Sequence, residues 1–169
     1  MPLNNIHTAR LMLIPVTLEI TTGLIEGDPQ ALETIGIKAH ADWPTNDTKD
    51  ILPIVNRTLA SNGSPSGFEF WMIVHSADQT IIGDIGFHGK PDVHGDVEIG
   101  FGLVEEAHGK GYGSEGFNGI INWLKTQNDV KKLYANCLID NHASYHLLIK
   151  NGMKEIYRNT HSIYFHMLF

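Results

Sequence analysis

The sequence predicts an α+β domain, a mixed α/β arrangement in which helices flank a mostly antiparallel central sheet. Residues 68–74 and 80–87 are two apolar segments joined by a short polar turn at residues 76–79, a pattern typical of a β-hairpin. Further along, apolar residues follow the i, i+3, i+4, i+7 spacing of one helix face: Phe117, Ile120, Ile121 and Leu124. Because 169 residues is the length of one domain, we expect residues 1–169 to form a single domain.

The first third of the chain is expected to contain one strand and two helices. The strand opens at Leu11 and Leu13, with Arg10 as a further candidate, and Pro15 closes it. A short helix is expected from about residue 28 to residue 36. A longer helix is capped by Asp47 and Thr48 and ends before a loop at residues 61–67. We expect one face of this longer helix to consist of Ile51, Ile54, Val55, Thr58 and Leu59.

After the hairpin, an alternating strand at residues 97–103 leads into the glycine-rich segment 108–114 and then into the helix that contains Phe117. The remaining elements are expected in this order: a strand at 132–139, a helix at 141–151, and strands near 153–158 and 162–168. Strands before and after two central helices are what an α+β domain requires.

The glycine-rich segment 108–114 predicts a phosphate site. It follows a strand and precedes a helix, an arrangement that presents free N–H groups and the positive end of the helix dipole to an anion. Glycines at Gly109, Gly111 and Gly113 let the backbone approach the phosphates closely and tolerate positive φ. We therefore expect a phosphorylated ligand at this loop.

Two glycine patterns overlap here. Gly111, Gly113 and Gly116 satisfy the dinucleotide pattern G-x-G-x-x-G, which also requires an acidic residue about 20 positions further on. The chain has Lys131 and Lys132 near that position instead. A dinucleotide-dependent oxidoreductase is thus the less favoured alternative.

The segment from His108 to Gly113 resembles the pyrophosphate loop of the GCN5-related N-acetyltransferase (GNAT) superfamily, Gln/Arg-x-x-Gly-x-Gly/Ala, with His at the first position. Residues 8–13 and 97–103 resemble the family's opening strand and the strand that enters its loop. Asn141-x-x-Ser144, followed by residues 150–153, resembles its second cofactor motif. The resemblance is to the ribosomal-protein-alanine N-acetyltransferase-like branch, and it implies a GNAT-like acyl-CoA N-acyltransferase fold and acetyl-CoA as co-substrate.

The resemblance also implies the residues that bind acetyl-CoA. The amides of the loop are the expected donors to the diphosphate, with Lys110 adding charge and Tyr112 covering the cofactor edge. The main chain near residues 101–104 is expected to polarise the thioester carbonyl. The full expected set is Phe101, Leu103, Val104, His108, Gly109, Lys110, Gly111, Tyr112, Gly113, Ser114, Asn141 and Ser144.

Acetyl transfer to an amine needs a base and an acid. Glu98, on the strand that leads to the loop, is the expected base, and an exposed strand carboxylate is the alternative interpretation. Many family members have a Tyr four residues before the helix-ending glycine, but this chain has Leu148 there. The resemblance suggests Ser144 as the acid instead, with Tyr145 as a second candidate.

The acceptor is expected to be an amine-bearing small molecule or a peptide or protein N-terminus. A net charge of −7 argues against nucleic acid and favours a cationic substrate. By resemblance, Trp43 and Phe87 are neighbours of the acceptor. A non-catalytic acyl-CoA-binding sensor remains an alternative function, and a homodimer remains an alternative to a monomer.

The remaining signals concern the compartment and metals. No signal peptide or membrane-spanning run is expected, and the single cysteine, Cys137, allows no disulfide within the chain, so we expect a cytoplasmic protein. His142 and His146 have a helical spacing that suits zinc, but no glutamate lies between them. We expect no metal.

Overall fold

The computed structural model describes residues 3–169, so Met1 and Pro2, where we expect no signal peptide, lie outside the described residues. Within residues 3–169, nine strands form one sheet. The strands are β1 (Ile6–His7), β2 (Leu11–Pro15), β3 (Lys38–Ala39), β4 (Phe70–His75), β5 (Thr80–Phe87), β6 (Asp96–Leu103), β7 (Lys132–Leu138), β8 (Lys154–Arg158) and β9 (Ser162–Leu168). Their order is β1-β2-β4-β5-β6-β7-β9-β8, and β3 pairs with β5.

The sheet is mostly antiparallel, as the sequence predicts. Two contacts are parallel, between β6 and β7 and between β3 and β5. The hairpin of β4 and β5 has its turn at the predicted residues, and β5 has the predicted bounds. The α+β class is therefore confirmed.

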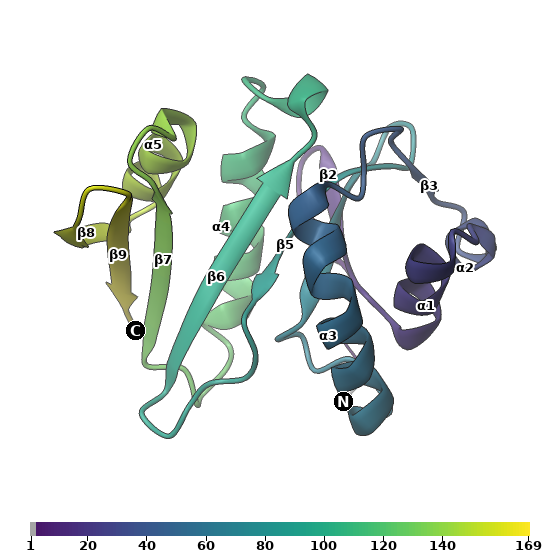
Figure 1. The fold of residues 1–169 in the computed structure, drawn as a ribbon, viewed down its shortest axis with the longest axis horizontal. Coiled ribbons are helices and arrows are strands. Elements are labelled where there is room, and N and C mark those ends of the chain that lie inside the picture. Colours follow the sequence, from purple (N-terminus) through teal and green to yellow (C-terminus); the bar gives the residue numbers. More distant parts are fainter. Residues whose placement is uncertain (1–2) are drawn as a thin grey trace.

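Helices lie on both sides of the sheet, with α3 in front of it and α4 behind it in Figure 1. The helices are α1 (Leu18–Glu26), α2 (Gln30–Thr34), α3 (Asn46–Asn62), α4 (Tyr112–Leu124) and α5 (His142–Lys150), with a 3-10 turn at Glu105–Ala107. Helix α1 was not predicted from the sequence. Its N-cap is Thr17, and it ends at Gly27, which has a φ of 73°.

The predicted face of α3 is only partly buried. The buried residues of the helix are Thr48, Leu52 and Leu59, so Leu59 is buried as the pattern indicates, whereas Ile51 and Ile54 are 37% and 58% exposed. The N-cap is Thr45, and the helix extends to Asn62. Ile51 and Val55 line a cavity beside the sheet, and Val55 also packs against the core.

Close packing fixes the position of α4. A Cβ atom on Gly119 would lie 3.3 Å from both Leu13 Cδ1 and Thr8 Cγ2. Phe117 and Ile120, on the same helix, are fully buried. The glycine loop at the start of α4 is therefore attached to a helix that cannot shift without disturbing the core.

Candidate active site

The site begins where β6 and β7 separate. The two strands pair only from Asp96–Lys132 to Glu98–Tyr134, and beyond that point they move apart (Figure 1). The Val104 amide donates to the Ile82 oxygen of β5 at 2.8 Å. Because N–H groups alternate along a strand, the amides of Phe101 and Leu103 face the space that β7 leaves.

Val104 does not belong to this edge. Its amide is used by β5, and its side chain is buried with 2% exposure. The alternation of the strand turns the N–H of Val104 away from the opening, so the expected contact of Val104 with the cofactor has no support from its main-chain amide and stays a prediction. Phe101 and Leu103 keep free amides there.

The glycine loop carries a run of unpaired amides. His108 N donates to Glu105 O at 3.0 Å, and Glu115 N donates to Gly111 O at 3.1 Å. Within residues 3–169, the six amides between them, from Gly109 to Ser114, donate to no main-chain or side-chain acceptor. Gly109 and Gly111 have φ of 75° and 83°, conformations that favour glycine. Such a curled run at a helix N-terminus is an anion-binding shape.

The loop is tied to β2 through Arg10. The Arg10 guanidinium donates to Glu115 Oε1 at 2.7 Å and to the Lys110 oxygen at 2.8 Å, and it lies 4.3 Å from the centre of the Tyr112 ring. Glu115 also accepts from the Arg10 amide at 2.8 Å and from the Thr8 hydroxyl. Burial opposes ionisation of Glu115, but the hydrogen bonds from Thr8 and Arg10 outweigh it and lower the pKa of its carboxyl.

A cavity of about 550 Å³ lies between the loop, the end of β6 and α5. It is lined by ten of the expected cofactor residues: Phe101, Leu103, His108, Gly109, Gly111, Tyr112, Gly113, Ser114, Asn141 and Ser144. Lys110 is not among the residues that line it, and its carbonyl oxygen accepts from Arg10, while its amide belongs to the run of free N–H groups. Other lining residues were missed by the sequence analysis: Asp47, Gly102, Ala107, Ala143, His146, Leu147 and Lys150.

Helix α5 forms the far wall of this cavity. Asn141 caps the helix, and its Oδ1 accepts from the Ser144 amide at 3.1 Å. Within residues 3–169, the hydroxyl of Ser144 has no hydrogen-bond partner, and Ser144 lines the cavity. Tyr145 packs against Phe165 and does not line it, and Leu148 is fully buried.

Glu98 lies at the point of strand separation but lines neither of the cavities that border β6. Its Oε1 accepts from Asn136 Nδ2 at 2.8 Å, and its Oε2 lies 3.1 Å from His88 Nδ1. His88 lines a second cavity of about 250 Å³, on the α3 side of β6. His88 thus connects Glu98 to that cavity, a contact that no local sequence pattern contains.

The two cavities meet at the middle of β6. Asp47, Phe101 and Gly102 line both of them. Phe87, an expected neighbour of the acceptor, lines the smaller cavity. Trp43 is buried behind it, with 3% exposure. A ligand at the glycine loop and a second ligand near α3 would therefore approach each other at Phe101 and Gly102.

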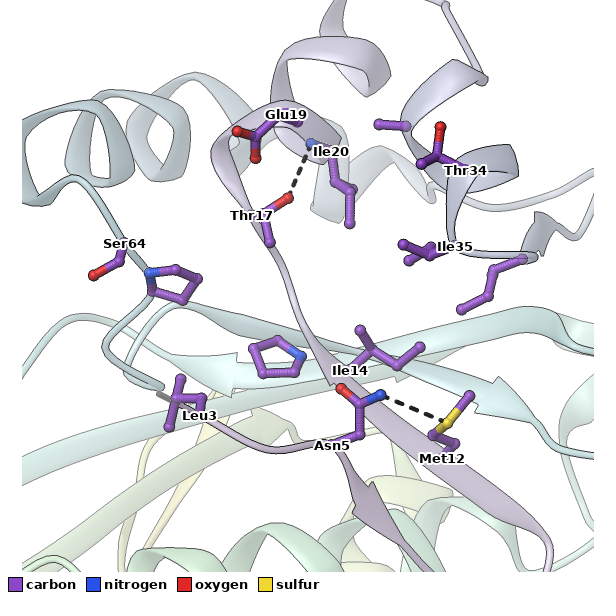
Figure 2. Close-up of a pocket in the computed structure, with 14 residues that line it drawn as sticks. Leu3, Asn5, Met12, Ile14, Thr17, Glu19, Ile20, Thr34, Ile35 and Ser64 are labelled. Carbon is purple, nitrogen blue, oxygen red and sulfur yellow. Dashed lines mark hydrogen bonds between the residues drawn. The ribbon is translucent and has the colours of Figure 1, made fainter. Parts of the chain in front are cut away.

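A larger cavity lies elsewhere, between β2 and the helices α1 and α2 (Figure 2). It measures about 870 Å³, and Ile14, Ile20 and Ile35 point into it. Glu19 is the single ionisable group among its lining residues within 3–169. Volume alone does not make a reaction site, so the glycine loop is the better candidate.

None of the helices within residues 3–169 combines the length and the apolar character of a membrane span. No group of three His, Cys, Asp or Glu side chains there is placed to hold a metal ion. His146 lines the larger of the two β6 cavities without such a group.

Known proteins share this arrangement. A family profile described as acetyltransferase (GNAT) domain matches residues 10–154. YjdG of Bacillus subtilis (strain 168), an uncharacterized N-acetyltransferase, is 32% identical over 147 residues, which are 87% of this chain and 88% of that protein. RimL, a ribosomal L7/L12 alpha-N-protein acetyltransferase, superimposes with a TM-score of 0.67 at 18% identity, covering 98% of this chain and 94% of that one. MccE, a microcin C7 self immunity acetyltransferase solved with acetyl-CoA and AMP, gives a TM-score of 0.65 at 15% identity, covering 96% and 94%. At such identities the solved structures establish the fold alone, and that fold is the predicted one.

Proposed function

Because this chain belongs to the acetyltransferase (GNAT) family, we propose that it transfers an acetyl group from acetyl-CoA to a primary amine. The observation that carries this proposal is the run of six unpaired amides from Gly109 to Ser114 at the start of α4. A diphosphate fits this run, because unpaired N–H groups and the positive end of the helix dipole both stabilise concentrated negative charge. A nicotinamide dinucleotide also carries a diphosphate, so binding of acetyl-CoA must be compared with binding of NADH.

The donors along β6 fit the rest of acetyl-CoA. The free amides of Phe101 and Leu103 can pair with the amide groups of its pantetheine arm, which continue the strand pattern left open by β7. Asn141 and Ser144 line the same cavity from α5 and would border the arm. When bound, acetyl-CoA supplies an acetyl group activated as a thioester.

The amine must lose a proton before it can react, because its ammonium form has no free electron pair. We assign this step to His88, with Glu98 as the residue that positions it. If His88 Nδ1 carries a proton and donates to Glu98, Nε2 presents a lone pair. Nε2 lies 3.3 Å from the place that a Cβ on Gly100 would occupy, so the glycine leaves His88 room beside β6.

Ser144 is the proposed proton donor to the departing thiolate. Its hydroxyl faces the cavity and is free, while its amide is held by Asn141. We propose that the protein works as one domain in the cytoplasm. Its acceptor is a small amine or a peptide N-terminus, and the activity named for RimL supports the second source.

The buried Leu148 favours one rival function, a sensor that binds acyl-CoA without turnover, because the position lacks the usual acid. Thermal melting with acetyl-CoA, CoA or NADH identifies the cofactor. A ligand at about 100 times its Kd adds about 2.7 kcal/mol, which raises Tm by roughly 5–10 °C for a chain of this size. A rise with NADH alone would refute the proposal. Release of free CoA in the presence of an amine panel then separates the enzyme from the sensor.

A further inference from the structure

Asp84, on β5, is a carboxylate that the structure holds in place beside the smaller cavity. Its Oδ2 accepts two hydrogen bonds, from Trp43 Nε1 at 2.8 Å and from the Thr48 hydroxyl at 2.5 Å. Both donors are buried, with 3% exposure each. The carboxylate is therefore fixed in one orientation by two side chains that have little freedom to move.

The other oxygen of this carboxylate is unpaired. Within residues 3–169, no group donates a hydrogen bond to Asp84 Oδ1. Asp84 lines the cavity, and it lies opposite Gly102, where the two cavities meet. Among the described residues no buried side-chain oxygen lacks a partner, so this oxygen is open to the cavity, where water or a ligand can donate to it.

The charges around the cavity indicate what that ligand is. Burial raises the pKa of the Asp84 carboxyl against the opposing hydrogen bonds of Thr48 and Trp43, and the charge of Asp47 raises it further. Asp47 lines the same cavity, and no Lys or Arg is among its lining residues within 3–169. Two carboxylates and no fixed cation attract a cationic ligand.

Apart from His88, Thr45 and Thr48, the other side chains that line the cavity are apolar. The lining side chains include three aromatic rings and two aliphatic groups: Phe70, Phe87, Phe101, Ile51 and Val55. A cation that enters this space must carry an apolar part to replace the water it displaces. Aromatic faces also attract a cation directly.

We propose that Asp84 binds the ammonium group of the acetyl acceptor and that the acceptor carries this group on a short apolar stem. The role of the bound amine as acetyl acceptor rests on the proposed function, whereas the binding of an ammonium group by Asp84 does not. Trp43 and Thr48 are the positioning residues for Asp84. The stem belongs either to a free arylalkylamine or to the first residue of a peptide, and the ammonium chemistry is the same in both.

Calorimetric titration of the CoA-saturated protein tests this without turnover. The probes are 2-phenylethylamine, the neutral 2-phenylethanol and the peptide phenylalanyl-glycyl-glycine. We expect the wild type to bind one of the two ammonium probes at least about tenfold more tightly than the alcohol, as a charge-assisted hydrogen bond predicts. Whichever ammonium probe binds more tightly identifies the source of the stem.

Asp84→Asn keeps the shape of the side chain and an acceptor for Trp43. We expect this variant to lose about 10- to 100-fold in affinity for the ammonium probe and to bind the alcohol unchanged. Asp50→Asn is the matched control, since Asp50 is exposed on the same helix as Thr48 and lines no cavity. Melting with acetyl-CoA shows whether each variant is folded.

Three results would overturn the proposal: equal binding of amine and alcohol to the wild type, unchanged amine affinity in Asp84→Asn, or no ammonium binding by a protein that binds CoA. The comparison of probes on the wild type holds even if the Asn variant does not fold. Failure of acetyl-CoA to stabilise the protein would instead count against the proposed cofactor.

Discussion

Replacing Gly109 with Ala tests the glycine loop at a position where a side chain has room. The φ of Gly109 is 75°, and a Cβ there would have no atom within 4 Å. The cost to folding is therefore the strain of a left-handed Ala, about 1–2 kcal/mol, or roughly 2–8 °C in Tm. Contacts with the rest of the protein contribute nothing to this cost.

Gly27 provides the matched control. It has a φ of 73° and no atom within 4 Å of its Cβ position, but it ends α1, away from the loop. We expect Gly27→Ala to lose the same stability as Gly109→Ala. Only the loop variant should also lose affinity for acetyl-CoA, because the added methyl group and the altered backbone disturb the amides that face the diphosphate.

The expected loss is one or two hydrogen bonds to a charged group, or about 10- to 100-fold in Kd. Titration calorimetry of both variants with acetyl-CoA measures it, and melting curves without ligand measure the common loss of stability. The same Kd for the two variants would refute the assignment of the loop as the diphosphate site. A larger loss of stability in Gly109→Ala would show that the loop has contacts that its geometry does not suggest.

Three further variants test separate parts of the site. Ser144→Ala should lower kcat by about tenfold or more and leave the Kd for acetyl-CoA unchanged, since the amide of Ser144 and not its hydroxyl is used in the helix cap. Unchanged steady-state turnover would mean that Ser144 has only a structural role. Glu98→Gln should lower kcat and leave the Kd for acetyl-CoA unchanged, because the uncharged amide holds the Nδ1–H group of His88 less strongly than the carboxylate does. A wild-type kcat would separate Glu98 from proton transfer. Glu115 has a lowered pKa in the folded protein, so its stabilisation is complete above its ordinary pKa of 4.5 and is lost as pH falls through the folded value. Denaturant titrations should therefore find Glu115→Gln less stable than the wild type by about 1–3 kcal/mol at neutral pH and equal to it in strong acid, and a pH-independent difference would contradict this.

The elements with a clear local signal were predicted well. β5 has the predicted bounds, and the glycine loop lies between a strand and a helix as expected. Periodicity was only partly right on α3, where Leu59 is buried but Ile51 and Ile54 are exposed, and Ile51 lines a cavity. It also missed α1, whose signals are a Thr17 cap and a Gly27 end around a segment with two buried residues, Ile20 and Thr21.

The site was predicted as far as it is local. The free amides of the loop follow from the glycines of residues 108–114, but the contact that ties the loop to β2 joins Arg10 to Glu115, which are 105 positions apart. The hydrogen bond from Arg10 to the carbonyl oxygen of Lys110 is likewise absent from the local pattern. A pattern of residue types states neither the direction of a carbonyl nor a distant partner.

The acceptor side was the least predictable, because its residues come from elements that no motif links. His88 follows β5, Asp84 lies within it, and Thr48 belongs to α3, and only the folded sheet brings them to one cavity. Glu98 was the expected base because it is a carboxylate on the strand that leads to the loop. In the structure, Asn136 and His88 contact its two oxygens. The oxygen that can accept a hydrogen bond from an ammonium group is on Asp84. We therefore infer separate roles for the two carboxylates: Glu98 positions the base His88, and Asp84 binds the positive charge of the substrate.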